Sequence, residues 1–182
     1  MIENYEGFSP SFDAKALVED LLESVRPDLL AGLRSVVLTN TSALTGDRKR
    51  QHRRRFGEKR GKVLLGRYHP TWNGELAWIE VFVDEALARR PAWLLRMTFF
   101  RAMFLGSVLY HEVGHHIHAT AKPEHRDGEK VADDWRTKLS GWHTKRRYPV
   151  TTALMRPTIR TLYPIVRWAR RRWAPAPAAS RR

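Results

Sequence analysis

The segment that most constrains the fold is a long apolar stretch that runs directly into a cluster of histidines. Residues 93–110 are almost all apolar, and the exceptions include Arg96 and Arg101. A helix that is apolar on nearly every side has to be covered by the rest of a domain, so we expect a central helix over residues 91–120. The two arginines leave no uninterrupted apolar run of about 20 residues, so we expect no transmembrane segment.

The rest of the chain combines helical and strand patterns. Apolar residues recur at helical spacing over residues 12–25, a helical turn is expected over 84–90, and a second long helix begins at Asp127 or Gly128. Strand patterns occupy residues 35–39, 62–68 and 76–83. We therefore expect an α+β fold in which a small, twisted, mostly antiparallel sheet packs on the central helix, with further helices flanking it.

Positive charge is concentrated in two segments. The chain of 182 residues has a net charge of +14. Residues 47–62 hold nine Lys or Arg and two acids, and residues 145–182 hold eleven Lys or Arg and no acid. Such segments attract polyanions, so we expect 48–62 and 145–172 to contact nucleic acid or another polyanion, unless they are simply solvated surface.

These patterns predict one main domain over residues 1–149, with 47–62 as a basic surface loop. A basic helical segment follows over 150–173, and a disordered tail over 174–182, where Pro and Ala dominate. The absence of cysteine excludes disulfides and thiolate zinc fingers. Because the N-terminal residues lack the order of a signal peptide, we expect a cytoplasmic protein.

The histidine cluster contains a motif with defined chemistry. His111-Glu112-x-x-His115 matches the pattern HExxH. Residues four apart project from one face of a helix, so the two imidazoles can converge on one zinc ion at about 2.0–2.1 Å. Glu112, next to the first ligand, can accept a proton from a metal-bound water. The motif therefore predicts zinc as the cofactor.

A catalytic zinc needs a third protein ligand. His118 lies about 10 Å further along the helix axis than His111, too far to bind the same ion, and Ala121 stands where a third histidine would follow in the longer HExxHxxGxxH pattern. We favour Glu129 at the start of the second helix and keep His125, which would make a three-histidine site, as the alternative. The downstream residues that can bind a metal are Glu124, His125, Asp127, Glu129 and Asp133.

With HExxH followed by Glu129-Lys-Val-Ala-Asp133, residues 33–142 resemble the gluzincin metallopeptidases. More narrowly, the segment looks like the minigluzincins and the ImmA/IrrE-type intracellular peptidases. The resemblance implies a zincin-like fold, a bound zinc and hydrolysis of peptide bonds in a protein or peptide substrate. It assigns His111, His115 and Glu129 as ligands, Glu112 as general base, and Asp133 as the residue that orients a ligand histidine.

The resemblance also suggests where the substrate binds, with strand 76–83 as the edge along which an extended peptide pairs. His143 and Tyr148 can stabilise an oxyanion, as downstream His or Tyr residues do in related enzymes, although surface or packing roles are the alternative for both. The competing hypothesis for function is a basic, nucleic-acid-associated binding module built on the same scaffold.

Overall fold

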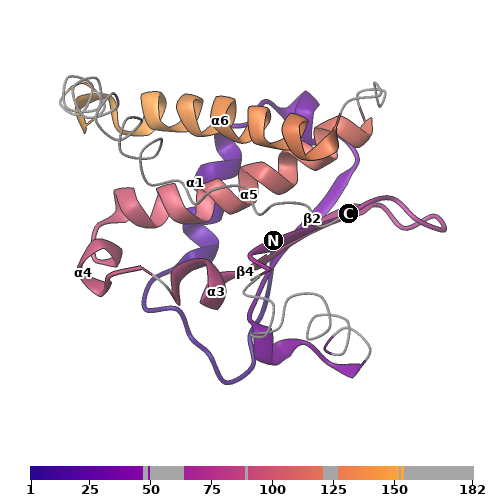
Figure 1. Cartoon of the computed structure of the whole chain (residues 1–182), viewed down its shortest axis with the longest axis horizontal. Helices are drawn as coiled ribbons and strands as arrows, with labels where there is room; N and C mark the ends of the chain where they lie inside the picture. The colour runs from indigo at the N-terminus through magenta and orange to yellow at the C-terminus, as the bar shows by residue number, and fades with distance from the viewer. Residues whose placement is uncertain (47–48, 50–63, 89, 121–126, 152, 154–182) are drawn as a thin grey trace, which may run out of the picture. The chain divides into compact units, whose positions relative to one another are not determined.

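The structure is a computed structural model of the chain, and it describes residues 1–46, 49, 64–88, 90–120, 127–151 and 153. The chain divides into two compact units, Met1–His143 and Thr144–Arg182. The sheet and the residues of the site belong to the first unit (Figure 1). The predicted basic loop 47–62, apart from Lys49, and the predicted tail 174–182 lie outside the described residues, as does nearly all of segment 150–173.

The described elements make an α+β fold, as the sequence pattern predicts. The strands are β1 (Ile2–Asn4), β2 (Leu33–Thr39), β3 (Gly66–His69) and β4 (Ala77–Phe82). The helices are α1 (Ala14–Glu23), α3 (Val83–Ala88), α4 (Ala92–Leu95), α5 (Thr98–Thr120) and α6 (Gly128–Arg147), and the 3-10 turns are η1 (Pro27–Leu30) and η2 (Thr41–Ala43).

The four strands form one mixed sheet in the order β1-β2-β4-β3. β1 and β4 both lie parallel to β2, and only β3 is antiparallel to its neighbour β4. The expectation of a mostly antiparallel sheet is therefore wrong. Helix α1 carries the chain from the end of β1 back to the start of β2, and such a crossover makes neighbouring strands parallel.

The strand at the open edge of the sheet differs from the predicted one. β4 pairs on both sides, with Ile79 opposite Val36 of β2 and opposite Tyr68 of β3. The strand predicted over residues 76–83 is thus an interior strand and offers no edge to a peptide. The edges of this sheet are β1 and β3.

Helix α5 is central to the first unit, as its apolar sequence predicts. It packs against β3 and β4 on one side and against α1 on another. Its side chains Leu105, Leu109 and Val113 are fully buried. The hydroxyl of Tyr110 donates a hydrogen bond of 2.9 Å to the carbonyl of Leu21 in α1, which satisfies the buried polar group.

The helix predicted over residues 91–120 is interrupted. Helix α4 ends at Leu95, and α5 begins at Thr98. The backbone N–H groups of Phe100 and Arg101 bond to the carbonyl of Met97, the residue just before α5. The continuous apolar pattern crosses this break, so periodicity alone did not reveal it. No helix in the part of the chain that the structure describes is long and apolar enough to span a membrane.

Helices α5 and α6 lie side by side and touch through their backbones (Figure 1). A Cβ atom at Gly114 of α5 would lie 2.7 Å from the Cα of Ala132 in α6 and 2.8 Å from its carbonyl oxygen. Such distances leave no room for a side chain at position 114. Glycine therefore allows the close approach that brings the first turn of α6 beside His111 and His115.

We expect Gly114→Ala to destabilise the protein by about 1–3 kcal/mol, because the added methyl group meets backbone atoms that cannot move independently. Gly141→Ala on α6 is the matched control, since nothing lies within 4 Å of its Cβ position. Alanine is the better helix former, so the control should be stabilised by up to about 1 kcal/mol. Urea denaturation measures both changes, and a Gly114→Ala protein as stable as the parent would contradict the close packing.

Candidate metal centre

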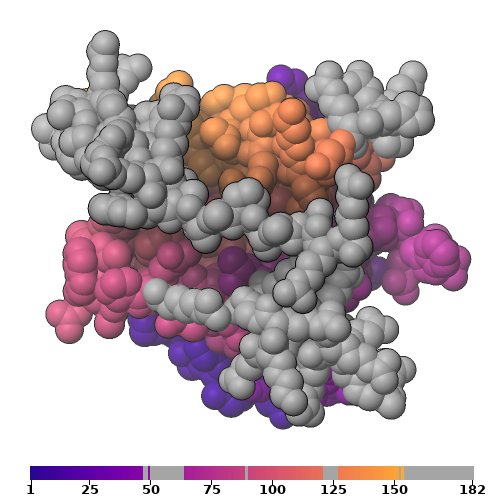
Figure 2. All heavy atoms as spheres, viewed as in Figure 1, coloured from indigo at the N-terminus to yellow at the C-terminus, as the bar shows by residue number. Residues whose placement is uncertain are grey.

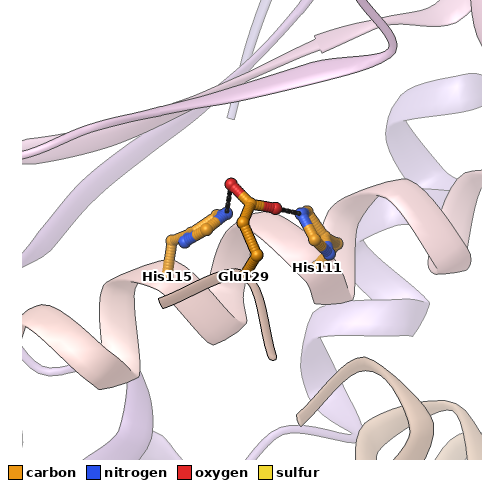
Figure 3. A group of neighbouring side chains, drawn as sticks. All are labelled: His111, His115 and Glu129. Atoms are coloured by element: carbon orange, nitrogen blue, oxygen red, sulfur yellow. Dashed lines mark ion pairs between the residues drawn. The ribbon is translucent and has the colours of Figure 1, made fainter. Parts of the chain in front are cut away.

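The two histidines of the HExxH motif lie one turn apart on α5 and project to the same side of the helix (Figure 3). Their ring centroids are 4.8 Å apart and the rings are nearly perpendicular. Burial is the largest cause that lowers the pKa of His115, and the neighbouring His111 acts in the same direction. A neutral imidazole keeps a nitrogen lone pair available for a metal.

Glu129 reaches between these two histidines from α6 (Figure 3). Its two carboxylate oxygens lie 3.4 Å from Nε2 of His111 and 3.7 Å from Nε2 of His115. The side chain of Asp127 accepts the backbone N–H of Glu129 at 3.1 Å, so it fixes the start of α6 and thereby the position of Glu129.

These three residues offer one ligand atom each, and the atoms all lie within 4.8 Å of one another. Within the described residues, His111, His115 and Glu129 are the single group of this kind that could hold a metal ion. The structure thus brings together the three ligands favoured from the sequence. His125, the alternative ligand, lies outside the described residues, as does Glu124.

Asp133, one turn beyond Glu129 on α6, binds the other ring nitrogen of His111. Nδ1 of His111 lies 3.0 Å from a carboxylate oxygen of Asp133, and Arg136 lies 3.3 Å from the same oxygen. Because an ionised carboxylate can only accept, Nδ1 of His111 is the donor. This contact directs the lone pair of Nε2 toward Glu129, the orientation that a metal ligand requires.

Glu112 points away from solvent and is 7 % exposed. Burial raises the pKa of Glu112 to about 7, with a smaller contribution from the negative charge of Glu129. The backbone N–H of Tyr68 donates to the carboxylate and partly offsets this rise in pKa. Glu112 is therefore held between α5 and strand β3, where burial favours its protonated form more than water does.

Gly66 of β3 makes this position of Glu112 possible. A Cβ atom at residue 66 would lie 2.8 Å from Cγ1 of Val108 and 2.9 Å from both Cγ and Oε1 of Glu112. No local motif in the sequence distinguishes Gly66 from the other glycines. A glycine inside a strand pattern is a signal of close backbone approach, but the pattern does not say which element approaches.

A second contact between α5 and β3 involves His116, which is fully buried and faces away from the metal ligands. Its Nε2 lies 3.1 Å from the carbonyl of Ala31, and its Nδ1 lies 3.4 Å from the hydroxyl of Tyr68. Burial is the main cause that lowers the pKa of His116. The pair of His116 and Tyr68 therefore ties β3 to α5 beside Glu112, a role that the sequence did not reveal.

The structure does not bring His143, one of the two suggested oxyanion stabilisers, to the cluster. His143 is buried among different partners: its Nδ1 lies 2.9 Å from the hydroxyl of Ser24, and its Nε2 lies 4.0 Å from a carboxylate oxygen of Asp20. These contacts hold α6 to α1 and correspond to the packing alternative for His143. Tyr148 belongs to the second unit.

Comparisons with known proteins give no independent guide to this site. No protein-family model, no curated protein and no solved structure matches the chain. The geometry of the cluster itself is therefore what bears on function.

The raised pKa of Glu112 predicts a pH-dependent stability for the metal-free protein. The folded state holds this proton up to about pH 7, whereas the unfolded chain releases it near pH 4.5. Between these values the folded state binds more protons, so its stability falls as the pH rises. Between pH 5 and pH 8, the free energy of unfolding of the parent should fall by roughly 2–3 kcal/mol more than that of Glu112→Gln. Urea denaturation with chelator present measures this difference.

Glu19→Gln on the exposed side of α1 is the control for this measurement and should keep the pH dependence of the parent. If Glu112→Gln shows the same pH dependence as the parent protein, Glu112 is not buried as the structure has it.

Proposed function

We propose that this protein is a zinc-dependent metallopeptidase of the gluzincin type, with His111, His115 and Glu129 as metal ligands and Glu112 as general base. One observation carries the proposal: a carboxylate from a second helix lies 3.4 and 3.7 Å from the two HExxH histidines. A histidine pair that only makes surface hydrogen bonds has no need of this third group. The α+β fold, with a helix bearing HExxH packed on a small sheet, supports a zincin-like architecture.

The donor set fits zinc. Two imidazole nitrogens and one carboxylate oxygen are the ligands of many catalytic zinc sites, which keep a further position open for water. Bonds of about 2.0–2.1 Å in tetrahedral geometry separate ligand atoms by about 3.4 Å. Each Glu129 oxygen lies close to that distance from one of the two histidines, and with one atom per residue the three ligand atoms lie within 4.8 Å. A bound zinc ion supplies a Lewis acid that lowers the pKa of coordinated water toward neutrality.

Glu112 is suited to move the protons of peptide hydrolysis. A general base works best when its pKa lies near the working pH, and burial raises the pKa of Glu112 toward that range. After accepting a proton from the attacking water, the same carboxyl group donates it to the nitrogen of the amine that leaves when the C–N bond breaks. The N–H of Tyr68 and the close contact with Gly66 fix the carboxylate, so little reorganisation is needed.

The edge strand β3 is the best candidate for binding an extended peptide substrate. The backbone N–H of Phe82 donates to the carbonyl of Leu65, so these two residues form a hydrogen-bonded pair. Such pairs alternate along an antiparallel ladder, so the backbone groups of Arg67 and His69 bond to β4. By alternation, Gly66 and Tyr68 direct their backbone groups toward the open edge. A peptide that pairs with this edge would pass Glu112, which already accepts the N–H of Tyr68.

The second candidate function is a nucleic-acid-associated binding module on the same scaffold. It is favoured by the charge of segments 48–62 and 145–172, which lie largely outside the described residues. Substitution of Arg53, Arg54 and Arg55 by Gln separates the two candidates. A peptidase keeps its hydrolytic rate after this change, whereas a binding module loses retention of DNA in moderate salt.

We expect the purified protein to bind about one zinc ion per chain, and the ligand variants to lose affinity in a defined order. Glu129→Ala should weaken zinc binding most, because it removes a ligand. Asp133→Ala should weaken it by about 10–100-fold, because His111 loses its orienting partner. His125→Ala should have little effect. Competition with a chromogenic chelator measures each affinity.

Asp134→Ala is the matched control for the Asp133 variant, since Asp134 is the next residue on α6 and is exposed. It should bind zinc as the parent does. If His125→Ala removes the metal while Glu129→Ala retains it, a three-histidine site replaces the one proposed here. If no variant and no preparation binds zinc, the peptidase proposal fails.

We expect Glu112→Gln to keep the zinc and to lower the hydrolysis of a mixed fluorogenic peptide library by about 10²–10⁴-fold, the contribution typical of a general base. The exposed Glu19→Gln variant should retain full activity. Metal analysis of both variants accompanies the rate measurement. Loss of zinc together with activity would make Glu112 structural, and an unchanged rate would remove it from the mechanism.

A further inference from the structure

Helix α4 and the turn that follows it expose large apolar side chains that the proposed active site does not use. The side chain of Trp93 is 63 % exposed and that of Met97 is 43 % exposed. Met97 lies two residues beyond the end of α4, in the bend that leads into α5. Leu94 and Leu95, which follow Trp93 on α4, are partly buried.

Two exposed arginines, Arg90 and Arg96, lie within three residues of Trp93 in the sequence. The guanidinium of Arg90 lies 4.5 Å from the ring centroid of Phe104 in α5. We call Arg90, Trp93, Arg96 and Met97 the α4 patch. Between Glu85 and Glu112 the chain contains four arginines and no acidic residue. The α4 patch therefore combines two exposed apolar side chains with two exposed arginines from the same short segment.

This combination matches the chemistry of an anionic membrane surface. Tryptophan is the side chain most suited to the boundary between head groups and acyl chains, since its ring is apolar and its N–H can bond to a polar group. Arginines next to it can pair with lipid phosphates and gain from the negative surface potential. A nucleic acid would use the arginines and could stack on Trp93, but it would leave the aliphatic Met97 without an apolar partner.

We propose that the α4 patch binds the protein reversibly to anionic lipid bilayers, with Trp93 and Met97 inserted at the head-group boundary. Helix α4 has only four residues, so the contact is peripheral. The patch lies at the N-terminal end of α5 and at the opposite end of the first unit from the hairpin that joins β3 and β4 (Figure 1). The pink part of the chain, which includes α4, is at the surface in the space-filling view (Figure 2).

Co-sedimentation with vesicles tests the proposal on the full chain. Vesicles of phosphatidylcholine alone are compared with vesicles containing 30 % phosphatidylserine, about the fraction that gives a strongly negative surface. The double variant Trp93→Ser/Met97→Ser should lower binding to the anionic vesicles by at least about tenfold. Arg90→Gln and Arg96→Gln should each lower it by about fivefold.

Trp72→Ser is the matched control. Trp72 is 73 % exposed, even more than Trp93, but it lies in the hairpin between β3 and β4. This variant should bind vesicles as the parent does. This control shows whether removing any exposed tryptophan lowers vesicle binding. All the variants keep the basic segments 48–62 and 145–172, so a difference in binding between them does not come from those segments.

Quenching of tryptophan fluorescence by brominated lipids provides a second measurement that does not depend on the double variant folding. Trp93→Phe keeps an aromatic ring and should keep vesicle binding, but it should lose most of the quenching. Unchanged vesicle binding by Trp93→Ser/Met97→Ser overturns the proposal. So does undiminished quenching in Trp93→Phe, or a double variant that loses retention of a single-stranded oligonucleotide while still binding vesicles.

Discussion

The close approach of α5 and α6 is the contact on which the candidate site depends. Because position 114 carries no side chain, the backbone of Ala132 can lie against α5. The approach brings the first turn of α6 level with the two histidines, and Asp127 begins the helix so that Glu129 faces them. One glycine on the histidine helix therefore determines whether three potential ligands from two helices can meet.

The site also depends on how β3 lies against the opposite side of α5. Gly66 admits the Glu112 side chain, the N–H of Tyr68 bonds to it, and the Tyr68 hydroxyl meets His116. The polar residues of the HExxH helix are thus divided between two neighbours: His111 and His115 face α6, whereas Glu112 and His116 face the sheet. Glu112 nevertheless lies near enough to the cluster for the negative charge of Glu129 to raise its pKa.

Local signals were sufficient to predict much of this arrangement. The buried α5, a start of α6 at Asp127 or Gly128 and the pairing of His111 with His115 follow from periodicity, turn residues and four-residue spacing, whereas the choice of Glu129 over His125 also used the resemblance to gluzincins. Sheet order and direction depend on pairing between segments more than 30 residues apart, so β1 was missed and the parallel pairs were predicted wrongly. The contacts of Gly66 and His116 with Glu112 and Tyr68 were equally hidden, because each joins segments more than 40 residues apart.

The location of Glu129 in the first turn of α6 has a consequence for how the chain would exchange metal. Helix ends fray more readily than their centres, and this carboxylate is 75 % exposed. A metal ion held by Glu129 would join the frayed end to the rigid middle of α5, so that metal occupancy and order at the start of α6 would rise and fall together. Chelation would then loosen the helix start before any other part of the first unit, and hydrogen exchange at its first amides would report the metal content of the protein.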